Sequence, residues 1–272
     1  MMKKTLNAVV AALLLLVVAP AVAPAKVVEI GRASEAEELP APSCPTSPCF
    51  AVSRTTGYQA KVGTNRGLMK VPENGRIVAW TIRLSQPGPS QVKFFNERLG
   101  GAASAGIAIL RTGNRLFGRV VAQSPIVKLD PFFGQTVQFP LETSISVKKG
   151  SMLALTVPTW APALATGLGG DTSWRASRPA GDCDDTSTQT AQTDIRDLAQ
   201  YRCLYQRVRL SYSATMITDP VPNKGTATTE TTPTTPGTTT PTTPGTTPTT
   251  PTTTTPATTP TTTTGTTTTP RR

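Results

Sequence analysis

Two tryptophans in loops rich in proline and glycine are the residues best suited to recognition chemistry. Trp160 follows Val-Pro-Thr, and Trp174 follows Gly-Gly-Asp-Thr-Ser, with Asp171 and Arg175 close by. Exposed indoles stack on sugar rings, and neighbouring charged groups can bind the hydroxyls. These four residues predict a glycan site. The alternative is that both indoles only pack at the rim of a core, as we expect for Trp80 on its apolar strand face.

A second group of chemically useful side chains consists of carboxylates. Asp182, Asp184 and Asp185 flank Cys183, and together with Asp171 they offer the oxygen ligands that Ca²⁺ prefers. The loop lacks the Asp-x-Asp-x-Asp-Gly spacing and closing Glu of a dedicated calcium site, so a solvated acidic turn is the alternative. No other cofactor is predicted. The same carboxylates are the candidates for a glycosidase pair, although the sequence places no second acid at a defined position relative to them.

The chain contains no histidine. This excludes Ser-His-Asp and Cys-His catalysis and every histidine-ligated metal site. An enzyme without histidine could still use carboxylates, a Ser-Lys dyad, or a single Tyr or Lys as its catalytic group. Ser90-Gln-Val-Lys93 has dyad spacing but lacks the companion motifs of penicillin-recognising enzymes. We therefore assign no catalytic residue.

Four cysteines lie in the part of the chain that we expect to be exported, where thiols oxidise. Their even number predicts two disulfides. We favour Cys44–Cys49, which closes a Pro-Thr-Ser-Pro loop, and Cys183–Cys203, with the longer-range pairings left open. A zinc site made of the four thiolates is the alternative, but the spacing lacks paired C-x2-C knuckles.

Both ends of the chain differ from a folded domain. Lys3 and Lys4 precede an apolar run at 8–19 and then small residues, which predicts a signal peptide at 1–25, too short to remain as a transmembrane helix. An acidic linker follows at 26–43. Residues 226–270 hold 30 Thr and 9 Pro, which predicts a disordered Thr/Pro-rich stalk at 220–272; a tail without a role is the alternative. The folded domain is expected at 44–219, and the protein in the medium or the cell wall.

Period-2 alternation dominates the predicted domain. It is clearest at 77–84 and at 207–216, where Val208, Leu210 and Tyr212 alternate with Arg207, Arg209 and other polar residues that would form a basic outer face. A hairpin is expected around Gly113-Asn114, and one short helix at 91–99. Many short strands between Gly and Pro turns predict an all-β fold, an antiparallel β-sandwich. The strand-turn-strand segment 145–157 favours a jelly-roll-like order.

Three segments also resemble uncharacterised secreted β-sandwich proteins of high-GC actinobacteria. They are Val71-Pro-Glu-Asn-Gly-Arg-Ile-Val-Ala-Trp-Thr-Ile-Arg-Leu84, Leu153-Ala-Leu-Thr-Val-Pro-Thr-Trp-Ala-Pro-Ala163 and Tyr201-Arg-Cys-Leu-Tyr-Gln-Arg-Val-Arg-Leu-Ser-Tyr-Ser-Ala-Thr215. The resemblance covers about 44–217 and implies export and a β-sandwich, but no assigned function.

Positive charge is concentrated in the predicted domain. Residues 54–219 carry 20 Lys and Arg against 11 Asp and Glu. The partners accessible to an exported basic domain are extracellular glycan and anionic wall polymer, while no nucleic-acid motif is present; a solubility role for the charge is the alternative. The leading interpretation is a non-catalytic secreted or wall-associated module. The alternative is a carboxylate-based polysaccharide hydrolase.

Overall fold

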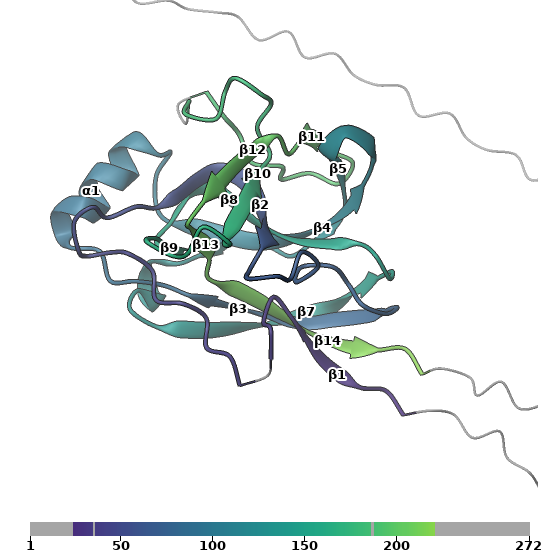
Figure 1. Cartoon of the computed structure of the whole chain (residues 1–272). Coiled ribbons are helices and arrows are strands. Elements are labelled where there is room, and N and C mark those ends of the chain that lie inside the picture. Colours follow the sequence, from purple (N-terminus) through teal and green to yellow (C-terminus); the bar gives the residue numbers. More distant parts are fainter. Residues whose placement is uncertain (1–23, 35, 186–187, 221–272) are drawn as a thin grey trace, which may run out of the picture. The chain divides into compact units, whose positions relative to one another are not determined.

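The computed structural model describes residues 24–34, 36–185 and 188–220. Residues 1–23 of the predicted signal peptide at 1–25 and residues 221–272 of the predicted stalk at 220–272 lie outside the described residues. Within the described part, two antiparallel β-sheets pack face to face (Figure 1), which confirms the prediction of an all-β antiparallel sandwich. No helix in these ranges is both long and apolar enough to cross a membrane.

The smaller sheet has four antiparallel strands in the order β1-β14-β3-β7. Their bounds are β1 (Val27–Ile30), β14 (Tyr212–Thr218), β3 (Gly75–Arg83) and β7 (Thr136–Val147). The larger sheet has the order β11-β5-β4-β8-β2-β10-β12, with β6 also paired to β4. These strands are β11 (Leu198–Gln200), β5 (Phe117–Gln123), β4 (Ser104–Thr112), β8 (Met152–Ala161), β2 (Val52–Lys61), β10 (Ser173–Ala176), β12 (Cys203–Gln206) and β6 (Val127–Lys128).

The remaining elements are short. Strands β9 (Leu164–Ala165) and β13 (Arg209–Leu210) form a two-stranded ribbon. The helix α1 (Pro89–Arg98) confirms the expected short helix, and one-turn 3₁₀ helices span Asn114–Leu116 and Asp130–Phe132. Strands β4 and β5 pair as the hairpin expected around Gly113-Asn114.

The core lies between the two sheets. Trp80 and Ile82 of β3 and Tyr212 of β14 are at most 1% exposed, as are Ile107 and Leu155 of the larger sheet. The Tyr212 hydroxyl donates to the carbonyl oxygens of Leu153 (3.1 Å) and Gly57 (3.3 Å). This small-sheet side chain therefore bonds the backbone of the larger sheet, and its burial raises its pKa well above the ordinary value.

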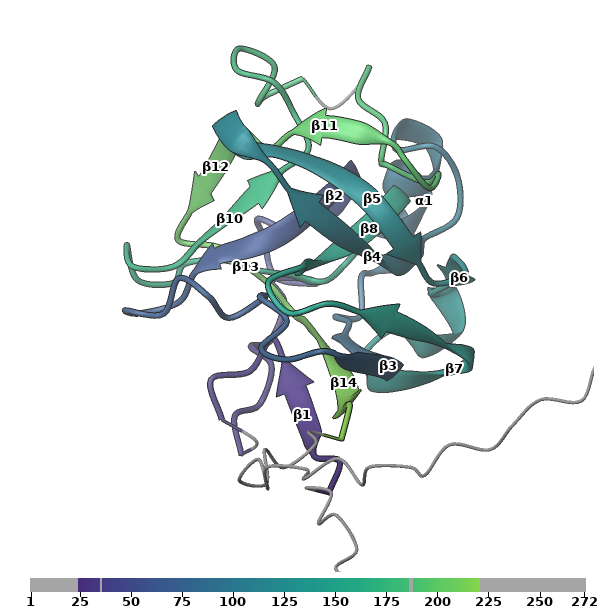
Figure 2. The ribbon, with the colours of Figure 1, turned by 90° about the vertical axis from the view of Figure 1, so that its right-hand side faces the viewer.

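The larger sheet curls, because its two end strands are close neighbours in the sequence. Only Tyr201 and Arg202 separate β11 from β12, so the chain must bring the two edges of the sheet together (Figure 2). Tyr201 fills the inside of the curl at 1% exposure, with its ring 5.2 Å from that of Tyr58. A Cβ on Gly118 would lie 2.7 Å from the Tyr201 ring, so only glycine allows this approach.

The strand-turn-strand segment at 145–157 does not form a hairpin. Strand β7 pairs with β3 in the smaller sheet, whereas β8 pairs with β2 and β4 in the larger one. The turn at Lys148–Gly150 therefore carries the chain from one sheet to the other. A turn sequence shows that the chain reverses direction, but not whether the strands on either side bond each other.

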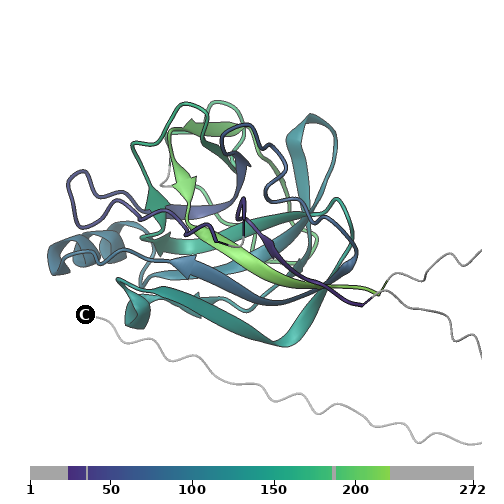
Figure 3. The same ribbon diagram turned by 60° about the horizontal axis from the view of Figure 1, so that its bottom comes forward.

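Residues 26–34 and 36–43, called here the N-terminal strap, are part of the fold, so the prediction of an acidic linker is wrong. Strand β1 pairs with β14 from Val27 opposite Ile217 to Ile30 opposite Ala214. Figure 3 shows the purple N-terminal strand beside the light-green C-terminal one. Ile30 and Leu39 are each 2% exposed. The folded unit therefore begins near Lys26 rather than at Cys44.

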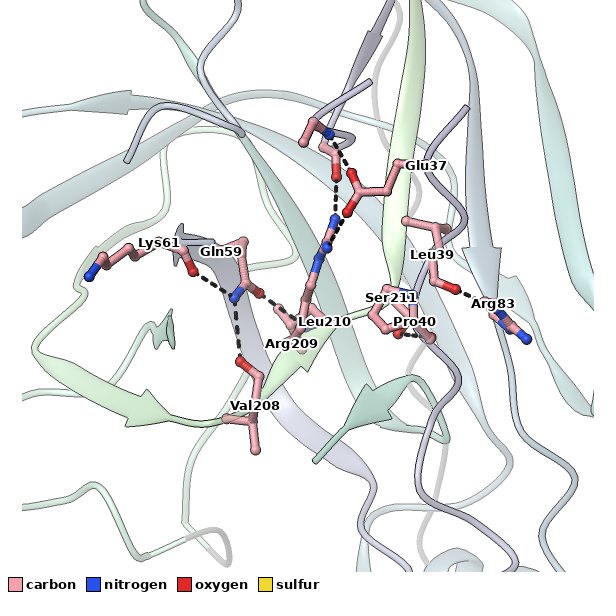
Figure 4. Close-up of polar contacts among 12 residues, drawn as sticks. Glu37, Leu39, Pro40, Gln59, Lys61, Arg83, Val208, Arg209, Leu210 and Ser211 are labelled. Atoms are coloured by element: carbon pink, nitrogen blue, oxygen red, sulfur yellow. Dashed lines mark hydrogen bonds and ion pairs between the residues drawn. The ribbon is translucent and has the colours of Figure 1, made fainter. Parts of the chain in front are cut away.

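The strap also covers part of the predicted basic outer face of the strand at 207–216, at Arg209 and Ser211 (Figure 4). Arg209 is 5% exposed and pairs with Glu37 at 2.6 Å, and its second terminal nitrogen donates to the Gly31 carbonyl at 3.0 Å. The Ser211 hydroxyl donates to the Pro40 carbonyl at 2.8 Å. Alternation predicts the inward face of this strand correctly. On its polar face Arg209 and Ser211 are buried, so Arg209 is not available to a polyanion, whereas Arg207 is exposed.

The Glu37–Arg209 pair makes the stability of the fold depend on pH. Burial raises the pKa of Glu37, but the bonds from Arg209 and the Ala33 backbone outweigh it, so the pKa is below the ordinary 4.5. A carboxylate with a lowered folded-state pKa stabilises the fold above its ordinary pKa. We expect the free energy of unfolding to fall as the pH drops below about 4.5, and the fall to be shallower in Glu37→Gln. Denaturant unfolding from pH 7 to pH 3 measures this; equal slopes for both proteins would contradict it.

Candidate functional site

The structure places one of the two predicted tryptophans beside a groove at the β12 edge of the larger sheet. This β10–β12 groove is lined by residues of β2, β9, β10, β12 and adjoining loops, and by none of the smaller sheet; its volume is about 740 Å³. Its lining includes aromatic, aliphatic and charged side chains: Phe50, Ser53, Trp174, Arg178, Asp184, Leu204, Tyr205, Arg207 and Val208.

Stacked aromatic rings line one wall of the groove; Trp174 is buried, at 4% exposed, and Tyr205 is half-buried, so Tyr205 is the more accessible ring of the pair. Trp174 of β10 and Tyr205 of β12 are opposite each other in the antiparallel pairing, so both side chains point to the same face. Their ring centroids are 4.7 Å apart, at an interplanar angle of 23°. Trp174 lies across Gly57 of β2, where a Cβ would come within 2.7 Å of the indole. Phe50 and Leu204 add apolar surface that is 48% and 41% exposed.

A buried guanidinium lies next to these rings. Arg178 is 4% exposed and donates to the Ser53 carbonyl (2.9 Å), the Tyr205 hydroxyl (2.6 Å) and the Cys183 carbonyl (3.4 Å). Its central carbon lies 5.9 Å from the centroid of the Tyr205 ring. Within the described ranges, no carboxylate oxygen lies within 4.0 Å of it. The Nε atoms of Arg178 and the Trp174 indole are buried without a hydrogen-bond acceptor. The groove therefore has net cationic character at its aromatic end.

Both predicted disulfides are confirmed, and one of them shapes the groove. Cys183–Cys203 ties the loop after Arg178 to the first residue of β12, and Cys44–Cys49 closes the loop before Phe50. The Cys183 carbonyl accepts from both Arg178 and Tyr205. The bridge thus holds the acceptor that orients these two side chains.

The other predicted glycan residues do not join Trp174. Trp160 is 0% exposed, donates from Nε1 to Asn96 and to the Gly101 carbonyl, and packs on Phe95, so this indole does not reach a sugar. It lies in β8, which continues through Pro158 to Ala161 instead of ending in a loop.

Asp171 and Arg175 lie elsewhere for different reasons. Neighbouring residues of a strand point to opposite faces, so Arg175 points away from Trp174 and donates to the Tyr201 carbonyl at 3.1 Å. It also opposes the rise that burial causes in the pKa of Tyr58. Asp171 belongs to the turn before β10 and does not line the groove.

The predicted calcium carboxylates are not gathered into a site. Among the described residues no group of three or more His, Cys, Asp or Glu side chains could hold a metal ion. Asp185 accepts from Thr188, the Asp182 backbone donates to the Pro179 carbonyl, and Asp184 lines the groove. Asp184 is also the one carboxylate in the described groove lining, so a glycosidase pair is not assembled there.

Sequence reasoning missed Phe50, Arg178 and Tyr205. Tyr205 carries a usable signal, because it stands two residues after the disulfide cysteine Cys203 and shares its strand face. Arg178 carries none, since it stands in a Ser-Arg-Pro segment typical of a loop. The chain matches no protein-family model, no curated protein and no solved structure.

Proposed function

We propose that this protein is an exported, non-catalytic binding module whose β10–β12 groove takes an extracellular or cell-wall glycan that bears carboxylate groups. The observation that carries the proposal is the guanidinium of Arg178, held against the stacked Trp174–Tyr205 pair without a carboxylate partner in the described residues. Aromatic rings offer a surface for the face of a sugar, and guanidinium groups favour carboxylate.

Several other features are consistent with this proposal. Two disulfides suit an oxidising compartment outside the cytosol. Arg207 adds a second cation to the groove lining. The hydrolase alternative has weaker support, because hydrolysis by carboxylates requires two acids at a set separation and the described lining supplies only Asp184.

Phe50→Ala is expected to weaken retention on an immobilised uronic-acid polysaccharide about fivefold, because it removes an exposed aromatic contact worth about 1 kcal/mol. Phe94→Ala is the matched control: Phe94 is 56% exposed, against 48% for Phe50, but lies on α1 outside the groove. Affinity electrophoresis in gels with and without the polysaccharide measures retention.

The charge of the ligand is tested with the same proteins. Binding to the uronic-acid polymer should weaken as the salt concentration rises, because salt screens charges over about 8–10 Å. The uncharged polymer of the same linkage should bind more weakly, and its binding should depend less on salt. Equal retention of the Phe50 and Phe94 variants on every polymer would overturn the groove as the binding site. Equal retention of charged and neutral polymers would overturn the role of Arg178.

A further inference from the structure

Two connected cavities, separate from the β10–β12 groove, lie where the two sheets part between β5 and β7. Figure 2 shows β4 and β5 above β3 and β7. One cavity, of about 860 Å³, is lined mainly by apolar residues, including Trp80, Val121, Phe139 and Ile145. It shares no lining residue with the β10–β12 groove. We call it the inter-sheet cleft.

The inter-sheet cleft reaches the core. Trp80 is 1% exposed and Ile145 is 9% exposed, and the rings of Trp80 and Phe139 lie 4.8 Å apart. At the rim, Ile195 is 57% exposed. The apolar part of this wall, which runs from Trp80 in the core to Ile195 at the surface, fits an aliphatic chain, and the one carboxylate in the described lining, Glu142, is exposed.

An irregularity in β7 lines the mouth of this cleft. Ile77 pairs with Ile145 and Ala79 pairs with Pro140, so residues 141–144 stand opposite Val78 alone. All four of these residues line the cleft. Bulges of this kind leave residues unpaired and bend an edge strand, and they are frequent beside binding sites. The bulge thus presents cleft-lining side chains that a regular strand would place on alternate faces.

The second cavity, of about 410 Å³, continues the first and is basic. The two share Val121 and Ser146 in their linings, and the second also contains Arg111, Lys148 and Lys149 but no acidic residue. These three cations are exposed, and in the described part of the chain none of them is within 4.0 Å of a carboxylate. Lys148 and Lys149 are placed here because the turn between β7 and β8 crosses from sheet to sheet.

We propose that this protein binds a single-chain anionic amphiphile, with its aliphatic chain in the inter-sheet cleft and its carboxylate or phosphate among Arg111, Lys148 and Lys149. The apolar cavity alone would accept many ligands. Its continuity with a cationic, acid-free cavity selects an anionic head group on the end of the chain.

Displacement of a fluorescent alkyl probe from the purified full chain tests the proposal. A long-chain alkyl phosphate and the carboxylate of equal length should displace the probe at concentrations about tenfold lower than the alcohol of that length, and the alkylammonium ion should be the weakest. Shortening the chain by two methylenes should weaken displacement about tenfold. Inorganic phosphate alone should displace nothing; if it competes as well as the alkyl phosphate, the aliphatic part of the proposal fails.

Variants separate the two cavities. Lys148→Ala/Lys149→Ala should remove the preference for the anionic heads and leave the alcohol unchanged, whereas the charge-matched Arg66→Ala/Lys93→Ala, at exposed positions outside both cavities, should leave both unchanged. Val121→Phe should weaken every alkyl ligand about tenfold by filling the shared wall. Val27→Phe adds the same ring at a 64% exposed position as its control.

Photolabelling locates the chain directly. An alkyl phosphate that carries a diazirine near its methyl end should label peptides from 121–127 and 139–146. Label on 50–53 or 204–208 would place the ligand in the β10–β12 groove and overturn this proposal, while leaving the glycan proposal to its own test. Equal affinity for all head groups, or no effect of Val121→Phe, would also overturn it.

Discussion

A chain that begins at Cys44 is expected not to fold, although alternation, turns and cysteines all lie within 44–219. The shortened chain lacks Ile30 and Leu39, each 2% exposed, and burial of such side chains contributes about 1.5–3 kcal/mol each. It also leaves the Arg209 guanidinium without Glu37, a loss of about 3–5 kcal/mol for a buried pair. Together these terms approach the whole stability of an ordinary domain, about 5–15 kcal/mol.

The comparison for this experiment is the chain that begins at Lys26, the residue expected to follow signal cleavage. Its backbone nitrogen donates to the Thr218 hydroxyl at 2.9 Å, so the paired structure starts there. Circular dichroism and urea unfolding should show a cooperative transition for this chain and none for the chain that begins at Cys44. Equal transition midpoints would mean that the strap is an accessory after all.

The strap explains why the sequence predicts the sheets better than the domain boundary. Strand positions follow from alternation, and the β4–β5 hairpin follows from Gly113-Asn114, because both signals are local. Residues 26–43 of the sequence hold four acidic residues and two prolines, a composition typical of a linker. What makes the strap structural is a buried arginine 172 residues away from Glu37 in the sequence, and no local pattern reports such a distant partner.

The candidate site likewise combines features that the sequence predicts with features that only the fold determines. The sequence predicts the Cys183–Cys203 bridge and singles out Trp174, and the structure brings both to the β10–β12 groove. Arg175 does not join Trp174 in the groove because adjacent strand residues point to opposite faces, so proximity in sequence is not proximity in space. The prediction for Trp160 is wrong because Pro158 suggests the end of a strand, whereas β8 continues past it. Position within a strand, rather than residue type, decides which side chains meet.

Glu37→Gln is expected to lower the free energy of unfolding by about 3 kcal/mol at pH 7, because it leaves a buried cation without its counter-charge. The Arg209 side chain is 6% exposed, and its Nε atom is buried without an acceptor, so no solvent compensates for the loss. Glu38→Gln is the matched control. Glu38 is 89% exposed and 3.6 Å from Arg83, and such surface pairs contribute about 0–1 kcal/mol.

The double variant Glu37→Gln/Arg209→Met separates the cost of an unpaired charge from the net value of the pair. Removing both charges from a buried site is often neutral when the replacement is apolar and of similar volume. We therefore expect the double variant to recover most of the stability lost in Glu37→Gln, and the two changes to be strongly non-additive in urea unfolding. If Glu37→Gln costs no more than Glu38→Gln, Arg209 is hydrated in solution and the strap is held by its apolar residues and the β1–β14 ladder instead. If the double variant is as unstable as Glu37→Gln, the pair itself stabilises the fold, and its two charges are needed to dock the strap.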